Sequence, residues 1–148
     1  MSALSAVKTI LEADSTLLAT ATGGCWDFDE TGRMGINRTS TPAAFDSNLI
    51  IKPCLLLKLR SSMPDGAIVD EAAQRVSYVQ MLECWFYADN AYTSIETMRD
   101  RVFVLLHAKR LTGPYFVRWA GDLRNQRDDE IDAFVERSTF QVNGIRSA

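Results

Sequence analysis

The chain has 148 residues, of which 47% are hydrophobic and 24% charged, and its formal net charge is -3 at pH 7. A chain of this size and composition predicts one globular domain over residues 1–148, with neither disorder nor a membrane-spanning segment. Lysine and arginine are spread along the sequence, so we expect no tight grip on nucleic acid. The N-terminus lacks the basic and apolar regions of a signal peptide, which indicates a cytosolic product.

The first fifty residues predict two short helices, a short strand and a long loop. Apolar residues recur at helical spacing after Ser2, which is suited to cap the helix, and this first helix ends at Asp14. A further helical turn is expected over residues 16–21 and a strand over residues 25–28. Residues 29–48 are rich in Gly, Asn, Thr, Ser and charge, and a loop of this length is usually functional or disordered.

The polar loop over residues 29–48 has two interpretations. It is either a contact arm for a neighbouring molecule or a surface loop without a role of its own. In the first interpretation, the residues expected to make the contact are Arg33, Met34, Asn37 and Arg38.

Two long strands follow and predict an antiparallel hairpin. In residues 49–60, leucine and isoleucine alternate with polar residues, while Pro53 cannot donate to a sheet and marks a bulge, an edge or the start of regular pairing. Residues 75–88 are β-branched, aromatic or otherwise apolar, which is typical of a strand. The connection over residues 61–74 contains the turn signal Met63-Pro64-Asp65-Gly66 and predicts a long, acidic hairpin tip.

A central helix comes next. Asp89-Asn90 predicts a turn, and Thr93 with Glu96 forms a capping box for a helix that extends to Leu111. Gly113-Pro114 then stops the chain before it re-enters the sheet.

Two further strands complete the predicted fold. They cover residues 115–119 and 134–143, and a charged connection over residues 123–130 joins them. The whole pattern predicts a single-domain α+β fold. Its sheet is mainly antiparallel, contains one long hairpin, and is packed by the N-terminal helix and the central helix.

Motifs for catalysis or cofactor binding are absent from the sequence. It has no glycine motif for phosphates or dinucleotides, no GxSxG and no HExxH, and its one histidine cannot form a histidine-based zinc site. The acidic run over residues 128–130 is expected to be a solvated turn. The remaining enzymatic option is a hydrolase with Cys25 as nucleophile and His107 as base. Otherwise Cys25, Cys54 and Cys84 are buried thiols, and we expect no catalytic residue, metal or cofactor.

The predicted strand over residues 75–88 is apolar on both faces. One face can pack against the helices, but a small domain has little left to cover the other. A partner subunit is therefore expected on the second face. The alternative is that a second helix layer or the 29–48 loop covers it. The residues of this expected subunit interface are Val79, Met81, Trp85 and Tyr87.

Four segments of the sequence carry a family resemblance. They are SALSAVKTILEADSTLLA near the N-terminus, KPCLLLKLRSS, SYVQMLECWFYADNAYTSIETMRDRVFVLLH, and RSTFQV late in the chain. Their order and length resemble the tail terminator, or tail completion, family of tailed-phage neck proteins. The resemblance covers most of the chain.

The resemblance implies a non-enzymatic structural protein of the virion neck or tail, assembled in the cytoplasm of a bacterial host. It implies a ring of identical subunits, typically six, that caps the tail tube, stops its polymerisation and joins it to the head connector. Its partners would be itself, the tube protein and a head-completion or connector protein, while DNA passes through without specific binding. The segment implied to face the tube or lumen comprises Met63, Pro64, Asp65, Gly66, Asp70 and Glu71.

Two other non-enzymatic roles stay open. Head-closure proteins and other head-tail connectors share similar small α+β builds. A module that binds a small ligand would instead be a monomer with an apolar pocket.

Overall fold

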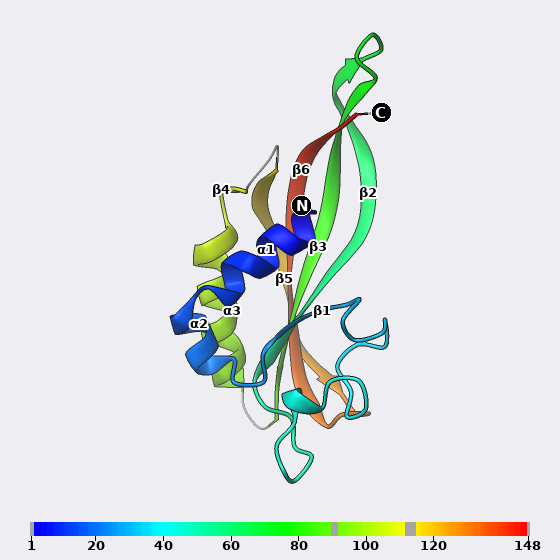
Figure 1. Cartoon of the computed structure of the whole chain (residues 1–148). Coiled ribbons are helices and arrows are strands. Elements are labelled where there is room, and N and C mark those ends of the chain that lie inside the picture. Colours follow the sequence, from blue (N-terminus) through cyan, green and yellow to red (C-terminus); the bar gives the residue numbers. More distant parts are fainter. Residues whose placement is uncertain (1, 90–91, 112–114, 148) are drawn as a thin grey trace.

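The structure is a computed structural model that describes residues 2–89, 92–111 and 115–147, with the backbone alone described for residues 66–68 and 147. In these ranges three α-helices lie on one side of a long, twisted six-stranded sheet (Figure 1). The strand order is β1-β2-β3-β6-β5-β4, and only the β1–β2 pair is parallel. The elements are α1 Ala3–Glu12, α2 Ser15–Thr20, β1 Cys25–Asp27, a 3-10 turn η1 Pro42–Ala44, β2 Cys54–Asp70, β3 Arg75–Ala88, α3 Tyr92–Leu106, β4 Lys109–Arg110, β5 Phe116–Asp128 and β6 Ala133–Ser147. The predicted α+β fold is confirmed.

The first two helices begin at side-chain caps. The Ser2 side chain accepts a hydrogen bond from the Ser5 N–H at 3.1 Å, as the sequence predicts. Asp14 caps α2 by accepting from the Leu17 N–H at 2.7 Å. Arg101 of α3 pairs with the same carboxylate at 2.6 Å, so Asp14 fastens α2 to α3. The hydrogen bond from Arg101 lowers the pKa of Asp14 from its ordinary value.

The β2–β3 hairpin differs from the predicted one at both ends of β2. Leu49 has a positive φ of 61° and lies outside the strand, which starts at Cys54, immediately after Pro53. The strand then continues to Asp70, so the prediction of a long connection was wrong and the turn is confined to residues 71–74. The expected turn signal instead produces a register shift between Pro64 and Val69, because proline has no N–H to donate.

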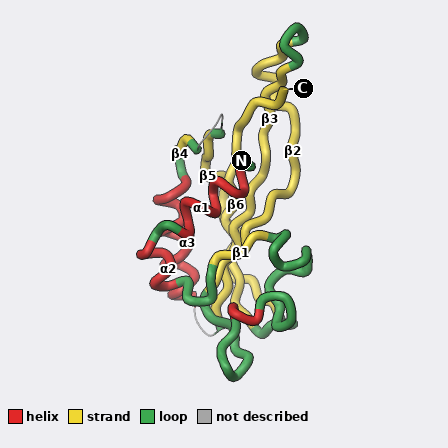
Figure 2. The backbone as a smooth tube through the Cα atoms, in the orientation of Figure 1, coloured by secondary structure: helices red, strands yellow, loops and turns green. Residues whose placement is uncertain are grey.

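Beyond the body of the molecule the hairpin projects as an arm, which we define as residues 61–80 with residues 141–147 of β6 beside them (Figures 1 and 2). Burial and a hydrogen bond with Tyr115 raise the pKa of Tyr78 in this arm. The Tyr78 ring lies over Gly144, where an added Cβ would come within 2.8 Å of the Tyr78 Oη. This packing holds β3 against β6 within the arm, while the hydrogen bond between Tyr78 and Tyr115 joins the arm to the body.

The last elements also differ in extent from the prediction. The described part of α3 already includes Thr93 inside the helix, so Thr93 is not its cap, and Asn90 lies outside the described residues. The helix ends at Leu106 rather than Leu111, because Ala108 has a positive φ of 57° and the chain turns into β4. The predicted connection over residues 123–130 is mostly strand, with register shifts that absorb its polar residues. Gly113-Pro114 lies outside the described residues.

Apolar side chains form two cores, one on each face of the sheet. The first face carries Leu82, Cys84 and Phe86 of β3 and packs against the three helices. The second face carries Tyr87 and packs against the loop that precedes β2 and the β5–β6 turn. The buried members of this second core are Ile36, Ala44, Phe45, Ile51, Cys54, Leu56, Tyr87, Ile131, Ala133 and Val135.

Candidate assembly surfaces

The hydrolase pair is not assembled. Burial raises the pKa of the Cys25 thiol to about 12, so it is not a thiolate at neutral pH. Cys25 lies on β1 at one edge of the sheet, whereas His107 follows α3 near the other edge, where its Nδ1 accepts a hydrogen bond from the Trp119 N–H at 3.1 Å. The described residues include no group of His, Cys, Asp or Glu able to hold a metal. None of the helices in the described ranges is long and apolar enough to span a membrane.

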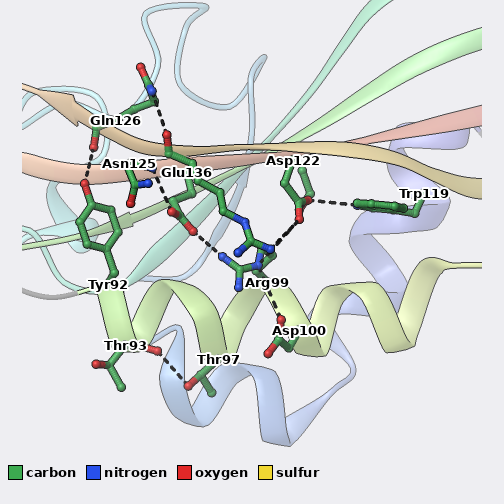
Figure 3. Close-up of polar contacts among 12 residues, drawn as sticks. Tyr92, Thr93, Thr97, Arg99, Asp100, Trp119, Asp122, Asn125, Gln126 and Glu136 are labelled. Atoms are coloured by element: carbon green, nitrogen blue, oxygen red, sulfur yellow. Dashed lines mark hydrogen bonds and ion pairs between the residues drawn. The ribbon is translucent and has the colours of Figure 1, made fainter.

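A buried ionic cluster fixes α3 on the sheet (Figure 3). Arg99 pairs with Glu136 of β6 and lies 4.0 Å from an Asp122 oxygen of β5. The second Glu136 oxygen accepts from the Asn125 N–H at 3.0 Å, and Asp122 accepts from the Ser138 hydroxyl at 2.7 Å. These partners satisfy the buried charges, so the cluster holds the fold together. Sequence reasoning missed it because its members are far apart in the chain.

One half of the second face is covered by the chain itself. Tyr87 is 7% exposed because the loop that precedes β2 covers it. No partner subunit is required to bury this residue. Arg38 holds the loop in place: it donates to the Leu49 and Glu130 carbonyls at 3.1 and 3.2 Å and lies over the Phe45 ring. We call the part of the second face that carries Tyr87 and the other residues of the second core the covered half.

The four residues of the 29–48 loop that were predicted to contact a neighbour therefore divide into two pairs. Asn37 and Arg38 organise the loop, since the Asn37 carboxamide accepts from the Ser40 N–H at 2.7 Å and donates to the Gly35 carbonyl. Arg33 and Met34 are exposed, and the Arg33 side chain is paired with nearby Asp29. Their role as a contact with a neighbour stays a prediction.

The other half of the second face is open. It holds a depression of about 500 Å³ that is walled by Arg60, Met81, Glu83 and Arg137, together with smaller polar residues. Glu83 is 2% exposed and lies between the two arginines, 3.0 Å from Arg60 Nε and 3.5 Å from Arg137 Nη1. The Arg137 guanidinium also lies over the ring of Trp85, 5.3 Å from its centroid, at the border with the covered half.

Two buried polar atoms of this face, Arg137 Nε and Asn143 Oδ1, have no hydrogen-bond partner in the described chain, whereas Glu83 Oε1 is paired with Arg60 Nε at 3.0 Å. The strand register places both residues on the second face, because Arg137 is opposite Trp85 and Asn143 is opposite Val79. Buried polar atoms in folded proteins nearly always have partners. Because both atoms are buried in the monomer, bound water can satisfy them without a partner chain.

Apolar residues of the arm continue the open half of the second face. Met63 lies opposite Val79, and Ile145 lies opposite Ser77, so these apolar side chains share the second face with Met81. Met63 is 53% exposed. We define the open face by its charged and apolar members, which are Arg60, Met63, Val79, Met81, Glu83, Arg137 and Ile145. It unites Val79 and Met81 of the predicted interface with Met63 of the predicted tube-facing segment.

The rest of that tube-facing segment follows the outer end of the arm. The Ser77 hydroxyl donates a hydrogen bond to the Asp65 carboxylate across the hairpin, and Pro64 is exposed. Gly66 lies in the stretch 66–68, whose backbone alone is described. Asp70 and Glu71 are exposed at the turn, where Asp70 also accepts from the Ala73 N–H at 3.0 Å. Whether this segment meets a tube or a lumen stays a prediction.

On the opposite side of the molecule, α3 turns a second exposed surface outward. Its N-terminal part is acidic, at Glu96 and Asp100, and its C-terminal part is apolar, at Phe103 and Val104. Trp119 of β5 contacts Phe103 edge to face, with 6.0 Å between ring centroids. We call these five residues the helix ridge. Exposed aromatic and aliphatic groups in one patch are typical of an interaction surface.

No protein-family model matches the sequence, and no curated protein matches it. Among solved structures, a chain from the virion of a native gene transfer agent (GTA) particle has a similar fold. The TM-score is 0.64 at 14% sequence identity, and the match covers 98% of this chain and 96% of that chain. At this identity the likeness concerns the fold, and it extends over nearly the whole of both chains.

Proposed function

We propose that the protein is a structural component of a tailed, phage-like virion and acts as a tail terminator. Its subunits form a ring, with six as the expected number, that caps the tail tube and joins it to the head connector. The observation that carries the proposal is the open face, where the exposed apolar residues Met63 and Ile145 continue a depression walled by Arg60, Met81 and Arg137. Such a surface is expected of a subunit that is completed by its neighbours.

The full-length fold likeness to a chain of a gene transfer agent virion supports the same class of function. The proposed partners are further copies of the chain, the tail tube protein and a head-completion or connector protein. The net charge of -3 suits a ring through which DNA passes, because an acidic lumen does not retain phosphates. The arm, with Asp70 and Glu71 at its turn, is the proposed source of that acidic surface.

The ring is tested by native mass spectrometry over a range of protein concentrations, where a species of six times the chain mass is expected. The capping role is tested by adding the protein to growing tail tubes of the same particle. A terminator stops elongation and is found by electron microscopy at one end of each tube. A head-closure protein would bind the connector and leave tube growth unchanged. A chain that binds neither tube nor connector, and stays monomeric beside them, would contradict the proposal.

A further inference from the structure

We propose that neighbouring copies join through the helix ridge of one copy and the open face of the next. This contact rests on the proposed ring but goes beyond it, because it states which two surfaces meet. The ridge consists of Glu96, Asp100, Phe103, Val104 and Trp119, and it would lie along the depression beside Arg60 and Arg137.

The positions of the two surfaces suit a ring. The helices pack on the first face of the sheet, so the outer side of α3 and the second face lie on opposite sides of the protomer (Figure 1). A contact between two different surfaces of identical subunits is head to tail, and it repeats from copy to copy until it closes. A two-fold dimer would instead pair each surface with itself.

The charges of the two surfaces are complementary. The inner end of the open face presents Arg60 and Arg137 around the single carboxylate of Glu83, which leaves an excess of positive charge. The corresponding end of the helix ridge presents Glu96 and Asp100, and the Asp100 side chain is 78% exposed although it lies 3.6 Å from Arg99. Carboxylates of the ridge would therefore lie against the guanidinium groups that line the depression, above all the exposed one of Arg60.

The apolar parts of the two surfaces also correspond. The ridge continues from its acidic end to Phe103, Val104 and Trp119, and Val104 is 65% exposed. The open face continues from its arginines to Val79 and Met63 on the arm. Burial of these side chains against one another would remove apolar surface from water, which is the main favourable contribution to association.

The spacing between charged and apolar parts agrees as well. Eight helical residues separate Glu96 from Val104, a rise of about 12 Å along the axis. Four strand residues separate Glu83 from Val79, a distance of about 14 Å along β3. The acidic and apolar parts of the ridge can therefore meet the basic and apolar parts of the open face at the same time.

Cysteine cross-linking tests this pairing. In the variant Val104→Cys/Met63→Cys each copy carries one thiol on each surface, and a short bismaleimide should link successive copies into a ladder of dimers, trimers and larger species up to the full ring. Each single variant should remain uncross-linked, and a mixture of the two should give dimers alone. The native thiols Cys25, Cys54 and Cys84 are buried and should not react.

The matched control is Val104→Cys/Met34→Cys, in which the second thiol replaces a still more exposed methionine, 76% against 53% for Met63, on the loop before β2. It should give no ladder. A ring seen by mass spectrometry without a Val104–Met63 ladder would overturn this contact and leave the ring intact. Links formed by Val104→Cys alone would indicate a two-fold contact and would also overturn it. A wild-type chain that never assembles, together with no ladder, would overturn the ring and the contact together.

Discussion

The covered half and the open half of the second face differ in whether the chain itself buries their apolar side chains. Around Tyr87 the chain supplies its own cover, and Arg38 fastens that cover with two hydrogen bonds to carbonyl oxygens. Beyond Glu83, toward the arm, the same face leaves the apolar residues Met63 and Ile145 exposed. The difference separates residues that stabilise the monomer from residues available for assembly.

The largest expected effect on the monomer comes from the ionic cluster on the first face. Arg99→Ala should lower the free energy of unfolding by about 3–5 kcal/mol, because it leaves the buried Glu136 carboxylate without its partner. The measurement is urea denaturation followed by circular dichroism. The control is Arg60→Ala, which removes one arginine from the buried Glu83 but leaves Arg137 as a second partner, so its loss should be the smaller of the two. Equal losses would contradict the distinction between the two regions.

Within the second face, Tyr87→Ala should destabilise the monomer by about 3 kcal/mol, since it leaves a cavity beneath the loop. Met63→Ala on the open half should change monomer stability by below about 1 kcal/mol. Both values come from the same denaturation experiment at a concentration where the chain is monomeric. If Met63→Ala were the more damaging of the two, the arm would be part of the monomer's core rather than an assembly surface.

Gly144→Ala tests how closely β3 and β6 pack within the arm. The new methyl group would lie 2.8 Å from Tyr78 Oη, so we expect a loss of about 1–3 kcal/mol in stability. The double variant Gly144→Ala/Tyr78→Val removes the clashing ring atoms, and its loss should be smaller than the sum of the two single losses. Strict additivity would show that the ring and the glycine do not interact.

On the helix ridge, Asp100→Lys should leave the free energy of unfolding within about 0.5 kcal/mol of the wild type, because this side chain is exposed. It should weaken assembly by roughly fivefold per contact, or about 1 kcal/mol. Native mass spectrometry across a dilution series measures the change. Asp129→Lys, at an exposed site on the β5–β6 turn, is the matched control and should assemble normally. The opposite ranking would place the interface at that turn.

The smallest expected effect concerns the ion pair between Asp14 and Arg101, which holds α2 against α3. This pair lies outside both halves of the second face. Because Arg101 lowers the pKa of Asp14, the charged form stabilises the fold fully above the ordinary pKa of 3.8. That contribution should be lost as the pH falls through the lower pKa of the folded state. Asp14→Asn keeps an acceptor for the cap but removes the charge, so the wild type's advantage should be present at neutral pH and vanish in acid. An advantage that persists in acid would contradict this cause.

Local signals in the sequence were sufficient for some elements and insufficient for others. The strand Arg75–Ala88 and the cap at Ser2 follow from periodicity and capping chemistry over a few residues. The end of β2 does not, because a proline turn signal is overridden when the next strand, itself held by β6, offers a continuous partner. The cover over Tyr87 depends on contacts between segments distant in sequence, which no local pattern specifies.

The candidate site was predictable in the same partial way. The two-sided apolar character of β3 drew attention to the second face, but it could not tell Tyr87, which the loop covers, from Val79 and Met81, which lie toward the arm. The helix ridge was not predicted at all. The sequence signal was present in Phe103 and Val104 on the side of α3 opposite its buried stripe.

The interrupted pairing of β2 has a consequence for how copies can aggregate. In the described chain β1 pairs with β2 only as far as Leu57, so the remainder of β2 is an outer strand whose backbone could recruit another strand. Register shifts follow Leu59 and Pro64, so the outward-facing backbone groups of β2 are irregularly spaced. An edge with irregular spacing is a poor template for the addition of another strand. Open-ended stacking of copies along the sheet is therefore disfavoured.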